Sequence, residues 1–179
     1  VTELSRGIKL FLLVGGRGTR LSSVTNGKAK PLVNIDNKNF IDHVLENLSG
    51  FDITLVCSDL NYNQFVEYMM YGVSVINEGS PSGTGGFLSK VDLPESFYVM
   101  NGDTFYSGEL NLDCDESTIF VAEEDVTSDV GYIHGENGKV KYFVEKNPNA
   151  SGKKLVSLGI YKLFKKDLDI PNKLPISME

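Results

Sequence analysis

A glycine-rich, basic segment, Phe11–Leu32 (FLLVGGRGTRLSSVTNGKAKPL), holds residue types that could do chemistry. Gly15, Gly16 and Gly18 can adopt positive φ at little cost, so main-chain N–H groups can approach an anion closely. The segment has no acidic residue, and its four cationic side chains within fourteen residues are Arg17, Arg20, Lys28 and Lys30. This combination is typical of a polyphosphate site, because the cations supply charge that main-chain dipoles alone cannot.

The positive charge is confined to one part of the chain. The sequence has 179 residues and a net charge of −7, yet residues 6–30 contain six basic side chains and no acidic one. Affinity for a nucleic-acid backbone depends on lysine and arginine neutralising phosphates, so the overall charge argues against a nucleic-acid partner. A local basic cleft instead favours a small anionic ligand.

Length and composition are those of a globular protein. We expect residues 1–179 to form a single domain, since 41% of the residues are hydrophobic and 23% are charged. No apolar run is long enough to cross a membrane, so no membrane partner is expected. Two widely separated cysteines, Cys57 and Cys114, indicate neither a disulfide framework nor a zinc site and favour a reducing cytoplasm. The oligomeric state stays open, and a homo-oligomer is compatible with the sequence.

The first half of the chain alternates strand and helix patterns, which predicts a parallel α/β sheet. Apolar runs indicate buried strands, and apolar residues at helical spacing indicate amphipathic helices. The expected strands are 7–14, 53–57, 73–76 and 96–100, the expected helices are 40–48 and 62–71, and 31–35 is expected to be extended. A glycine-rich loop at 82–90 should open a short helix. Ligands bind at the carboxyl edge of such a sheet.

From residue 118 the pattern changes to strands joined by turns. Strands are expected at 118–123, 130–135, 140–145 and 156–164, with a hairpin turn at 135–138. The predicted fold class is therefore α/β, with a Rossmann-like, mixed but mainly parallel central sheet, helices on both faces and a β-rich extension.

Six ordered motifs resemble those of a known family. They are Val14–Leu21 (VGGRGTRL), Lys30-Pro31, Gly83–Gly86 (GTGG), Asn101–Thr104 (NGDT), Phe143–Lys146 (FVEK) and Gly159–Tyr161 (GIY). In this order and spacing the chain resembles the sugar-1-phosphate nucleotidyltransferases, or nucleotide-sugar pyrophosphorylases. Within that family it is most similar to D-glycero-D-manno-heptose 1-phosphate guanylyltransferases. The resemblance implies the nucleotide-diphospho-sugar transferase fold, with the β-rich extension on the sugar side.

The resemblance also implies a reaction. The phosphate oxygen of a sugar 1-phosphate attacks the α-phosphorus of a nucleoside triphosphate, which releases pyrophosphate and forms a nucleotide sugar. Two polyanions must be held together, so this chemistry needs positive charge and a divalent metal, here Mg²⁺, but no nucleophilic side chain. The expected partners are a nucleoside triphosphate and a sugar 1-phosphate.

The matching motifs imply roles on the nucleotide side. Arg20 would neutralise the β- and γ-phosphates, and Lys30 would reach the α-phosphate. Glu78 would read the base, and a carboxylate can accept from both N1–H and the exocyclic amine of guanine, which favours GTP. The other nucleotide-binding residues implied are Val14, Gly15, Gly16, Gly18, Thr19, Gly83 and Thr84. The plainer alternatives are a solvated basic loop, above all for Arg17 and Lys28, and a glutamate that caps a turn.

Asp103 is the expected Mg²⁺ ligand. A carboxylate at a strand end, next to a glycine, supplies the hard oxygen donor that magnesium prefers, although such a sequence can also be a simple turn. Asp113 and Asp115 have the D-x-D spacing of some metal sites, but they precede a strand and are interpreted as a solvated loop.

On the sugar side the resemblance implies three further residues. Gly131 would let the backbone approach the sugar, Glu145 would accept hydrogen bonds from its hydroxyls, and Lys146 would hold its 1-phosphate. The alternative for the last two is an exposed charge pair on a strand.

Departures from the family pattern leave substrate and activity open. Asn147 replaces a proline, and Ser157 replaces an asparagine that would bond the sugar. Residues 177–179 resemble a family S-x-E motif after which a second metal-binding aspartate follows, so the chain is expected to lack the family's C-terminal part. There are two alternatives to a missing C-terminal part. Either Asp103, the phosphates and water alone hold Mg²⁺, or the protein is a non-catalytic homologue that binds nucleotide or nucleotide sugar and regulates a partner. A glycosyltransferase is a further alternative, but it gives no reason for the GGRGTR loop.

Overall fold

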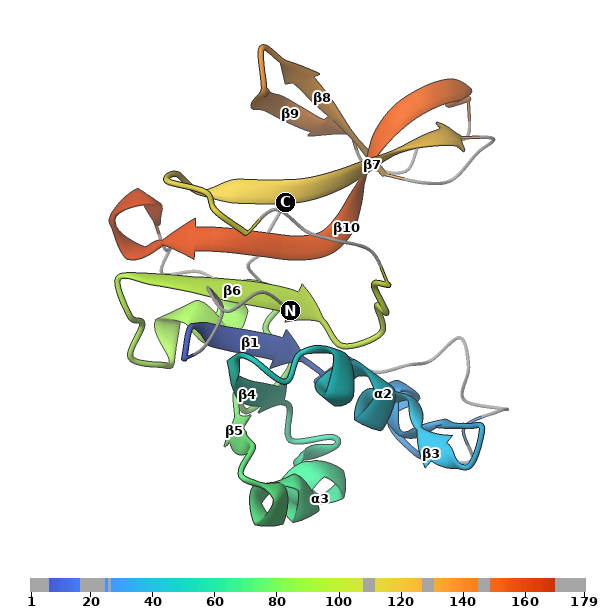
Figure 1. Cartoon of the computed structure of the whole chain (residues 1–179), viewed down its shortest axis with the longest axis vertical. Helices are drawn as coiled ribbons and strands as arrows, with labels where there is room; N and C mark the ends of the chain where they lie inside the picture. Colours follow the sequence, from blue (N-terminus) through green and yellow to red (C-terminus); the bar gives the residue numbers. More distant parts are fainter. Residues whose placement is uncertain are drawn as a thin grey trace.

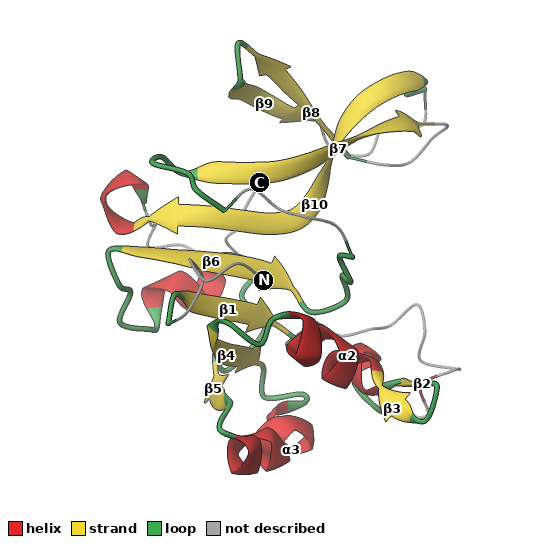
Figure 2. Cartoon of the chain, in the orientation of Figure 1, coloured by secondary structure: helices red, strands yellow, loops and turns green. Residues whose placement is uncertain are grey.

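An eight-stranded sheet with short helices on its two faces forms the fold (Figure 1, Figure 2). The computed structural model describes residues 7–16, 25, 27–107, 112–126, 131–144 and 149–169. The strand order is β5-β4-β1-β6-β10-β8-β9, and β7 also pairs with β10. The strands of this sheet are β1 (Lys9–Leu13), β4 (Asp52–Cys57), β5 (Ser74–Asn77), β6 (Ser96–Asn101), β7 (Thr118–Val126), β8 (Tyr132–Glu136), β9 (Lys139–Val144) and β10 (Gly152–Phe164).

The apolar strands of the first half are parallel, as the sequence predicts. β1 lies between β4 and β6, and β5 pairs with the other side of β4. The register places Leu13 beside Val56 of β4 and Asn101 of β6. The carboxyl ends of these strands therefore meet at one edge, and the loops that follow them lie where an α/β sheet binds its ligands.

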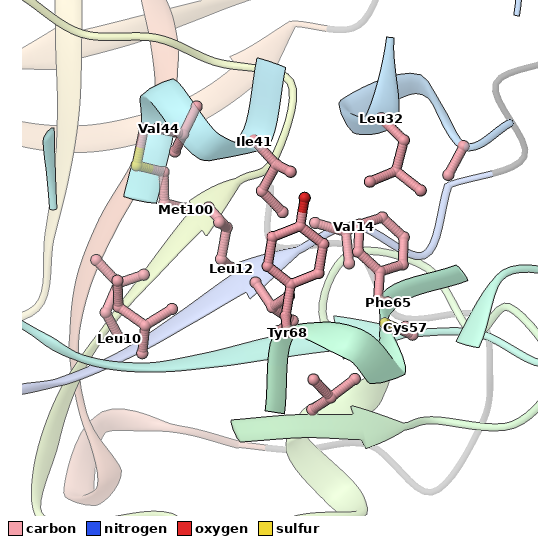
Figure 3. Close-up of a cluster of buried hydrophobic side chains, with 14 of the residues drawn as sticks. Leu10, Leu12, Val14, Leu32, Ile41, Val44, Cys57, Phe65, Tyr68 and Met100 are labelled. Atoms are coloured by element: carbon pink, nitrogen blue, oxygen red, sulfur yellow. The ribbon is translucent and has the colours of Figure 1, made fainter. Parts of the chain in front are cut away.

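Side-chain alternation along β1 divides the core between the two faces of the sheet. Leu10 and Leu12 point to one face, where they pack in one cluster with Ile41 of helix α2 (Phe40–Asn47) (Figure 3). Phe11 points to the other face, where its ring lies 5.1 Å from that of Phe87, measured between centroids. Phe87 belongs to the short 3₁₀ helix η5 (Gly86–Ser89). The prediction of helices on both faces is confirmed.

The helix predicted at 62–71 has two parts. Only α3 (Tyr62–Phe65) is α-helical, and η4 (Val66–Tyr71) continues it as a 3₁₀ helix. The buried residues Phe65 and Tyr68 are three apart, a spacing that lines up on one face in either helix type, so the apolar pattern cannot separate the two. The segment ends at Gly72, which has a φ of 79°.

The second half is antiparallel and extends the sheet away from β4 and β5 (Figure 1). β10 pairs with β6 and β7 and, through one register position, with β8. β8 and β9 form the predicted hairpin, whose turn has Asn137 and Gly138 at φ values of 52° and 73°. Asn-Gly is favoured in such a turn because both central residues need positive φ. The predicted fold class, a mixed and mainly parallel sheet with a β-rich extension, is confirmed.

Short elements complete the described chain. They are η3 (Lys30–Leu32), β2 (Asn34–Ile35), β3 (Lys38–Asn39) and η6 (Lys165–Asp167). The extended conformation predicted for 31–35 is wrong for its first residues, which lie in η3, with Pro31 in its first turn where no backbone N–H is needed. Among the described residues, no helix has the length and apolar character needed to span a membrane.

Candidate functional site

A pocket of about 200 Å³ lies where β1 ends. Five of the predicted nucleotide-binding residues contribute to it, although they come from two distant parts of the sequence. Its described lining consists of Leu13, Gly15, Gly16, Val56, Glu78, Pro81, Gly83, Thr84 and Phe87. The walls are thus the first glycine loop, the segment after β5, the second glycine loop and apolar side chains of β1, β4 and η5.

Buried polar residues after β4 fix the start of the first glycine loop. Asn61 donates from Nδ2 to the carbonyl oxygen of Val14 at 2.6 Å, and Ser58 donates from Oγ to the carbonyl oxygen of Gly15 at 2.9 Å. Asn61 Oδ1 in turn accepts from the main-chain N–H of Ser58 at 3.1 Å. Both side chains are at most 5% exposed. The sequence prediction missed this pair, because its partners are main-chain carbonyl oxygens more than forty positions away.

Gly15 itself leaves little room for a side chain. A Cβ placed on it would lie 3.1 Å from the backbone nitrogen of Ser58 and 3.2 Å from Glu78 Oε1. A side chain here would push against the backbone after β4 and against the glutamate expected to read the base. The glycine therefore favours the close approach of three segments.

We expect Asn61→Ala to lower the free energy of unfolding by about 1–3 kcal/mol, because it leaves the buried Val14 carbonyl and Ser58 N–H without this partner. Urea titration of the variant and the wild type measures this loss. Gln64→Ala is the matched control and should lose less stability. Gln64 lies on the same segment, and its side chain accepts a hydrogen bond from the N–H of Ala29 at 2.8 Å, but at a position that is only partly buried. An Asn61 variant as stable as the wild type would contradict the assigned role.

Glu78 places a half-buried carboxylate in the pocket wall. Burial raises the pKa of this carboxyl, while a hydrogen bond from Ser82 and the positive charge of Lys90 oppose that rise. The neighbouring thiol of Cys57 is buried, and burial together with the charge of Glu78 raises its pKa to about 12. Cys57 therefore stays protonated at neutral pH and offers no nucleophile.

Lys30 and Asp103 meet although 73 positions separate them. Lys30 Nζ lies 2.6 Å from Asp103 Oδ2, and both side chains are a little under half exposed. Asp103 follows β6, while Lys30 opens η3. The preceding Gly102 donates its N–H to the carbonyl oxygen of Leu13 at 2.8 Å, which fixes Asp103 close to the end of β1. A cation and a carboxylate expected to bind phosphate and metal thus lie together in accessible positions.

Gly131 lies at the start of the β8–β9 hairpin. It precedes Tyr132, which pairs with Val144 at the end of β9. A Cβ on Gly131 would lie 3.3 Å from the carbonyl oxygen of Val144. The next residues along the chain, Glu145 and Lys146, lie outside the described residues.

Other predicted residues also lie outside the part of the chain that the structure describes. These are Arg17, Gly18, Thr19 and Arg20. Lys28 is described and exposed. Asp113 and Asp115 are exposed in a segment without regular structure, as predicted. The described residues contain no group of three or more histidine, cysteine, aspartate or glutamate side chains that could hold a metal ion.

A comparison with known proteins identifies the family to which this chain belongs. A sequence model of the family described as nucleotidyl transferase matches residues 9–173. The chain belongs to the nucleotidyl transferase family. The recognition of the six motifs as those of this family is confirmed.

Curated relatives of this nucleotidyl transferase are mannose-1-phosphate guanylyltransferases. It is 32% identical over 198 residues to the mannose-1-phosphate guanylyltransferase catalytic subunit beta of Drosophila melanogaster, covering 98% of this chain and 53% of the relative. It is 33% identical over 196 residues to the probable mannose-1-phosphate guanylyltransferase 2 of Oryza sativa subsp. japonica, covering 96% of this chain and 54% of the relative. The chain therefore spans about half the length of the curated relatives that it matches.

Solved structures show the same fold. HddC from Yersinia pseudotuberculosis, in a crystal structure with GMP-PN, superposes with a TM-score of 0.74 and 28% identity, covering 96% of this chain and 83% of that one. The inositol-1-phosphate CTP transferase from T. maritima gives a TM-score of 0.72 at 18% identity, covering 97% of this chain and 78% of that one, which supports the fold alone.

Proposed function

We propose that this nucleotidyl transferase moves a nucleotidyl group from GTP to a sugar 1-phosphate, giving a nucleotide sugar and pyrophosphate. One observation carries the proposal: the first glycine loop, Glu78 and the Lys30–Asp103 pair converge at the carboxyl edge of the parallel strands. The glycine loop lets the backbone come close to the nucleotide. Glu78 supplies a group that can read the base, and Lys30 and Asp103 supply charges that can bind phosphate and metal.

The described residues have distinct tasks in this scheme. The loop that begins at Val14 wraps the nucleotide, with Gly15 and Gly16 leaving room for phosphates. Gly83 and Thr84 close the opposite wall of the pocket. The pocket volume of about 200 Å³ is below the roughly 300–1,000 Å³ of sites that enclose a whole drug-sized ligand, so it suits the base rather than the entire nucleotide. Lys30 holds the α-phosphate, at which the reaction takes place.

Further residues extend the proposal beyond the described part of the chain. Arg20, with Gly18 and Thr19 in the same loop, would bind the leaving pyrophosphate. Glu145 and Lys146 would hold the sugar 1-phosphate, next to Gly131. Their contribution is proposed from the family motifs and from their position directly after β9.

Asp103 fits Mg²⁺ because its carboxylate is accessible and lies next to the proposed phosphate-binding lysine. Magnesium is commonly held by one or two carboxylates together with substrate phosphates and water, so a single described carboxylate suffices. When bound, the metal neutralises charge on the transferring phosphoryl group. Lys30 contributes positive charge to the same group, and the ion pair with Asp103 orients its ammonium.

The choice of GTP rests on Glu78 and on the relatives. The ionised carboxylate of Glu78 can accept from two donors of guanine, and the curated relatives are named guanylyltransferases. The sugar is a further proposal: the relatives' names favour mannose 1-phosphate, and the resemblance of the motifs favours a heptose 1-phosphate. The fold of all 179 residues as one domain and a cytoplasmic location complete the proposal. Cys57 and Cys114 are not joined in a disulfide, which supports the location.

We expect Glu78→Gln to weaken GTP binding by about 10- to 100-fold, because a glutamine presents only one acceptor to two guanine donors and loses the charge. Binding of UTP should change much less, since uracil offers a single ring N–H donor. Calorimetry with GTP and UTP measures both effects. An unchanged preference for GTP would sink the assignment of Glu78 to the base.

Pyrophosphate release tests the proposed function. The protein is incubated with Mg²⁺, one of GTP, dTTP, UTP or CTP, and mannose 1-phosphate or heptose 1-phosphate. We expect release that requires both substrates and is fastest with GTP. Nucleotide binding without release in any combination would instead support a non-catalytic nucleotide-binding homologue.

A further inference from the structure

A serine and a lysine outside the predicted site hold Glu78. Ser82, which is 2% exposed, donates its hydroxyl to Glu78 Oε2 at 2.6 Å. Lys90 follows η5, and its ammonium donates to the main-chain oxygen of Glu78 and lies 3.5 Å from Ser82 Oγ. The two residues thus hold both the side chain and the backbone of Glu78.

The Ser82 contact determines how the carboxylate faces the pocket. Because Oε2 is bonded to Ser82, the carboxylate cannot rotate freely, and Oε1 lies over Gly15, where a Cβ would be 3.2 Å away. Each carboxylate oxygen has two acceptor positions, so Oε2 can accept a second hydrogen bond while Ser82 uses one. Both oxygens of Glu78 can therefore receive donors from a planar base in the pocket.

The same neighbours also affect the pKa of Glu78. Burial raises the pKa of the Glu78 carboxyl, and the Ser82 hydrogen bond and the Lys90 charge lower it. Titratable groups nearby among the described residues include the protonated Cys57 thiol and Asp59, whose carboxylate accepts from Asn77 Nδ2 at 2.9 Å. A protonated Glu78 would direct a donor at the donors of guanine, so the hydrogen bond and the charge that lower its pKa favour the form that accepts from guanine.

We propose that Ser82 and Lys90 are specificity-determining residues, which orient the Glu78 carboxylate so that it accepts two hydrogen bonds from guanine. The inference rests on the proposed function, because it presumes that Glu78 reads the base. Ser82 and Lys90 act through Glu78 and are positioning residues.

The test compares dissociation constants for GTP and ITP by calorimetry with Mg²⁺. Hypoxanthine, the base of ITP, lacks the exocyclic amine, so the ITP/GTP ratio reports the second hydrogen bond. We expect Ser82→Ala and Lys90→Met to weaken GTP binding by about three- to tenfold, with a smaller effect on ITP, so that the ratio falls. Ser89→Ala is the matched control, because Ser89 donates to the carbonyl oxygen of Gly86 and not to Glu78, and its ratio should match the wild type.

A pH series gives an independent readout. GTP binds the ionised form of Glu78, so affinity falls as the pH drops through the pKa of this group. Removing the Ser82 hydrogen bond or the Lys90 charge raises that pKa, so the fall should begin at higher pH in both variants. Lys90→Arg keeps the charge and should restore the wild-type profile. The double variant Glu78→Gln with Ser82→Ala should bind GTP as well as Glu78→Gln alone, because Ser82 acts through Glu78.

The outcomes separate this inference from the proposed function. If the wild type prefers GTP but Ser82→Ala and Lys90→Met keep both the ratio and the pH profile, the inference is overturned and the function stands. If the wild type does not bind GTP, both are overturned. Lys90 is exposed, so its variant should fold even if Ser82→Ala does not.

Discussion

Asp103→Asn should lower the rate of pyrophosphate release by about 10²- to 10³-fold while the protein stays folded. Asparagine keeps the size of the side chain but removes the charge that holds Mg²⁺, and loss of one group that stabilises transition-state charge typically has an effect of this size. Asp103 is 45% exposed and its pair with Lys30 is open to solvent, so the pair adds at most about 1 kcal/mol to stability. Steady-state assays over a range of Mg²⁺ concentrations, together with thermal melting, measure both effects.

Asp52→Asn is the matched control. Asp52 also forms a solvent-accessible ion pair, with Lys9 Nζ at 3.1 Å, but at the amino ends of β4 and β1, the opposite edge of the sheet. This variant should keep wild-type turnover and the same dependence on Mg²⁺. Wild-type turnover in Asp103→Asn would remove the residue from the mechanism.

Gly102→Ala should lower the free energy of unfolding by about 3 kcal/mol and reduce activity in the folded fraction. A Cβ at this position would lie 2.6 Å from the carbonyl oxygen of Leu13 and 2.7 Å from Val14 Cγ1. The carbonyl belongs to a central strand and accepts the N–H of Gly102, so neither backbone can move aside without loss of that hydrogen bond. Overpacking of this kind costs typically about 1–3 kcal/mol, and a backbone clash lies at the upper end.

Chemical denaturation with a common slope for variant and wild type measures this loss. Gly135→Ala is the control, because its Cβ would meet Leu155 Cδ1 at 3.5 Å, an ordinary contact, and its stability should change by less than about 0.5 kcal/mol. Equal stability of the Gly102 and Gly135 variants would contradict the close approach of β1 and β6 at the site.

Much of the site could be predicted because its residue types are chemical and follow strands. Gly15, Glu78 and Asp103 each come after a parallel strand, and such strands end at one edge of the sheet. The pocket and the Lys30–Asp103 pair accordingly combine segments that are distant in sequence.

The supporting residues could not be predicted, because their role depends on tertiary hydrogen bonds. Asn61 and Ser58 bond main-chain carbonyls more than forty positions away, and nothing in their local sequence names that partner. Ser82 is a short-range partner of Glu78, but a serine beside proline and glycine equally indicates an ordinary turn. Sequence types therefore reveal the residues that meet a ligand more readily than those that position them.

The start of β10 and its pairing with other strands could not be predicted from the sequence either. Its apolar pattern predicts a strand at 156–164, whereas the strand begins at Gly152 and joins β6 to the antiparallel extension. The register of β10 against β7 shifts between Ser157 and Tyr161, and Gly159, which lies between these residues, adopts a φ of 67°. Periodicity shows which residues are extended, but not which strands they pair with.

The most direct test of the account follows the α-phosphate of GTP. The protein is incubated with Mg²⁺, a sugar 1-phosphate and GTP labelled at the α-phosphate, and the products are separated. We expect label to enter a nucleotide sugar while unlabelled pyrophosphate is released, and neither product to form without the sugar 1-phosphate. Label recovered as GDP or GMP, independent of the sugar 1-phosphate, would show hydrolysis instead of transfer and contradict the central claim.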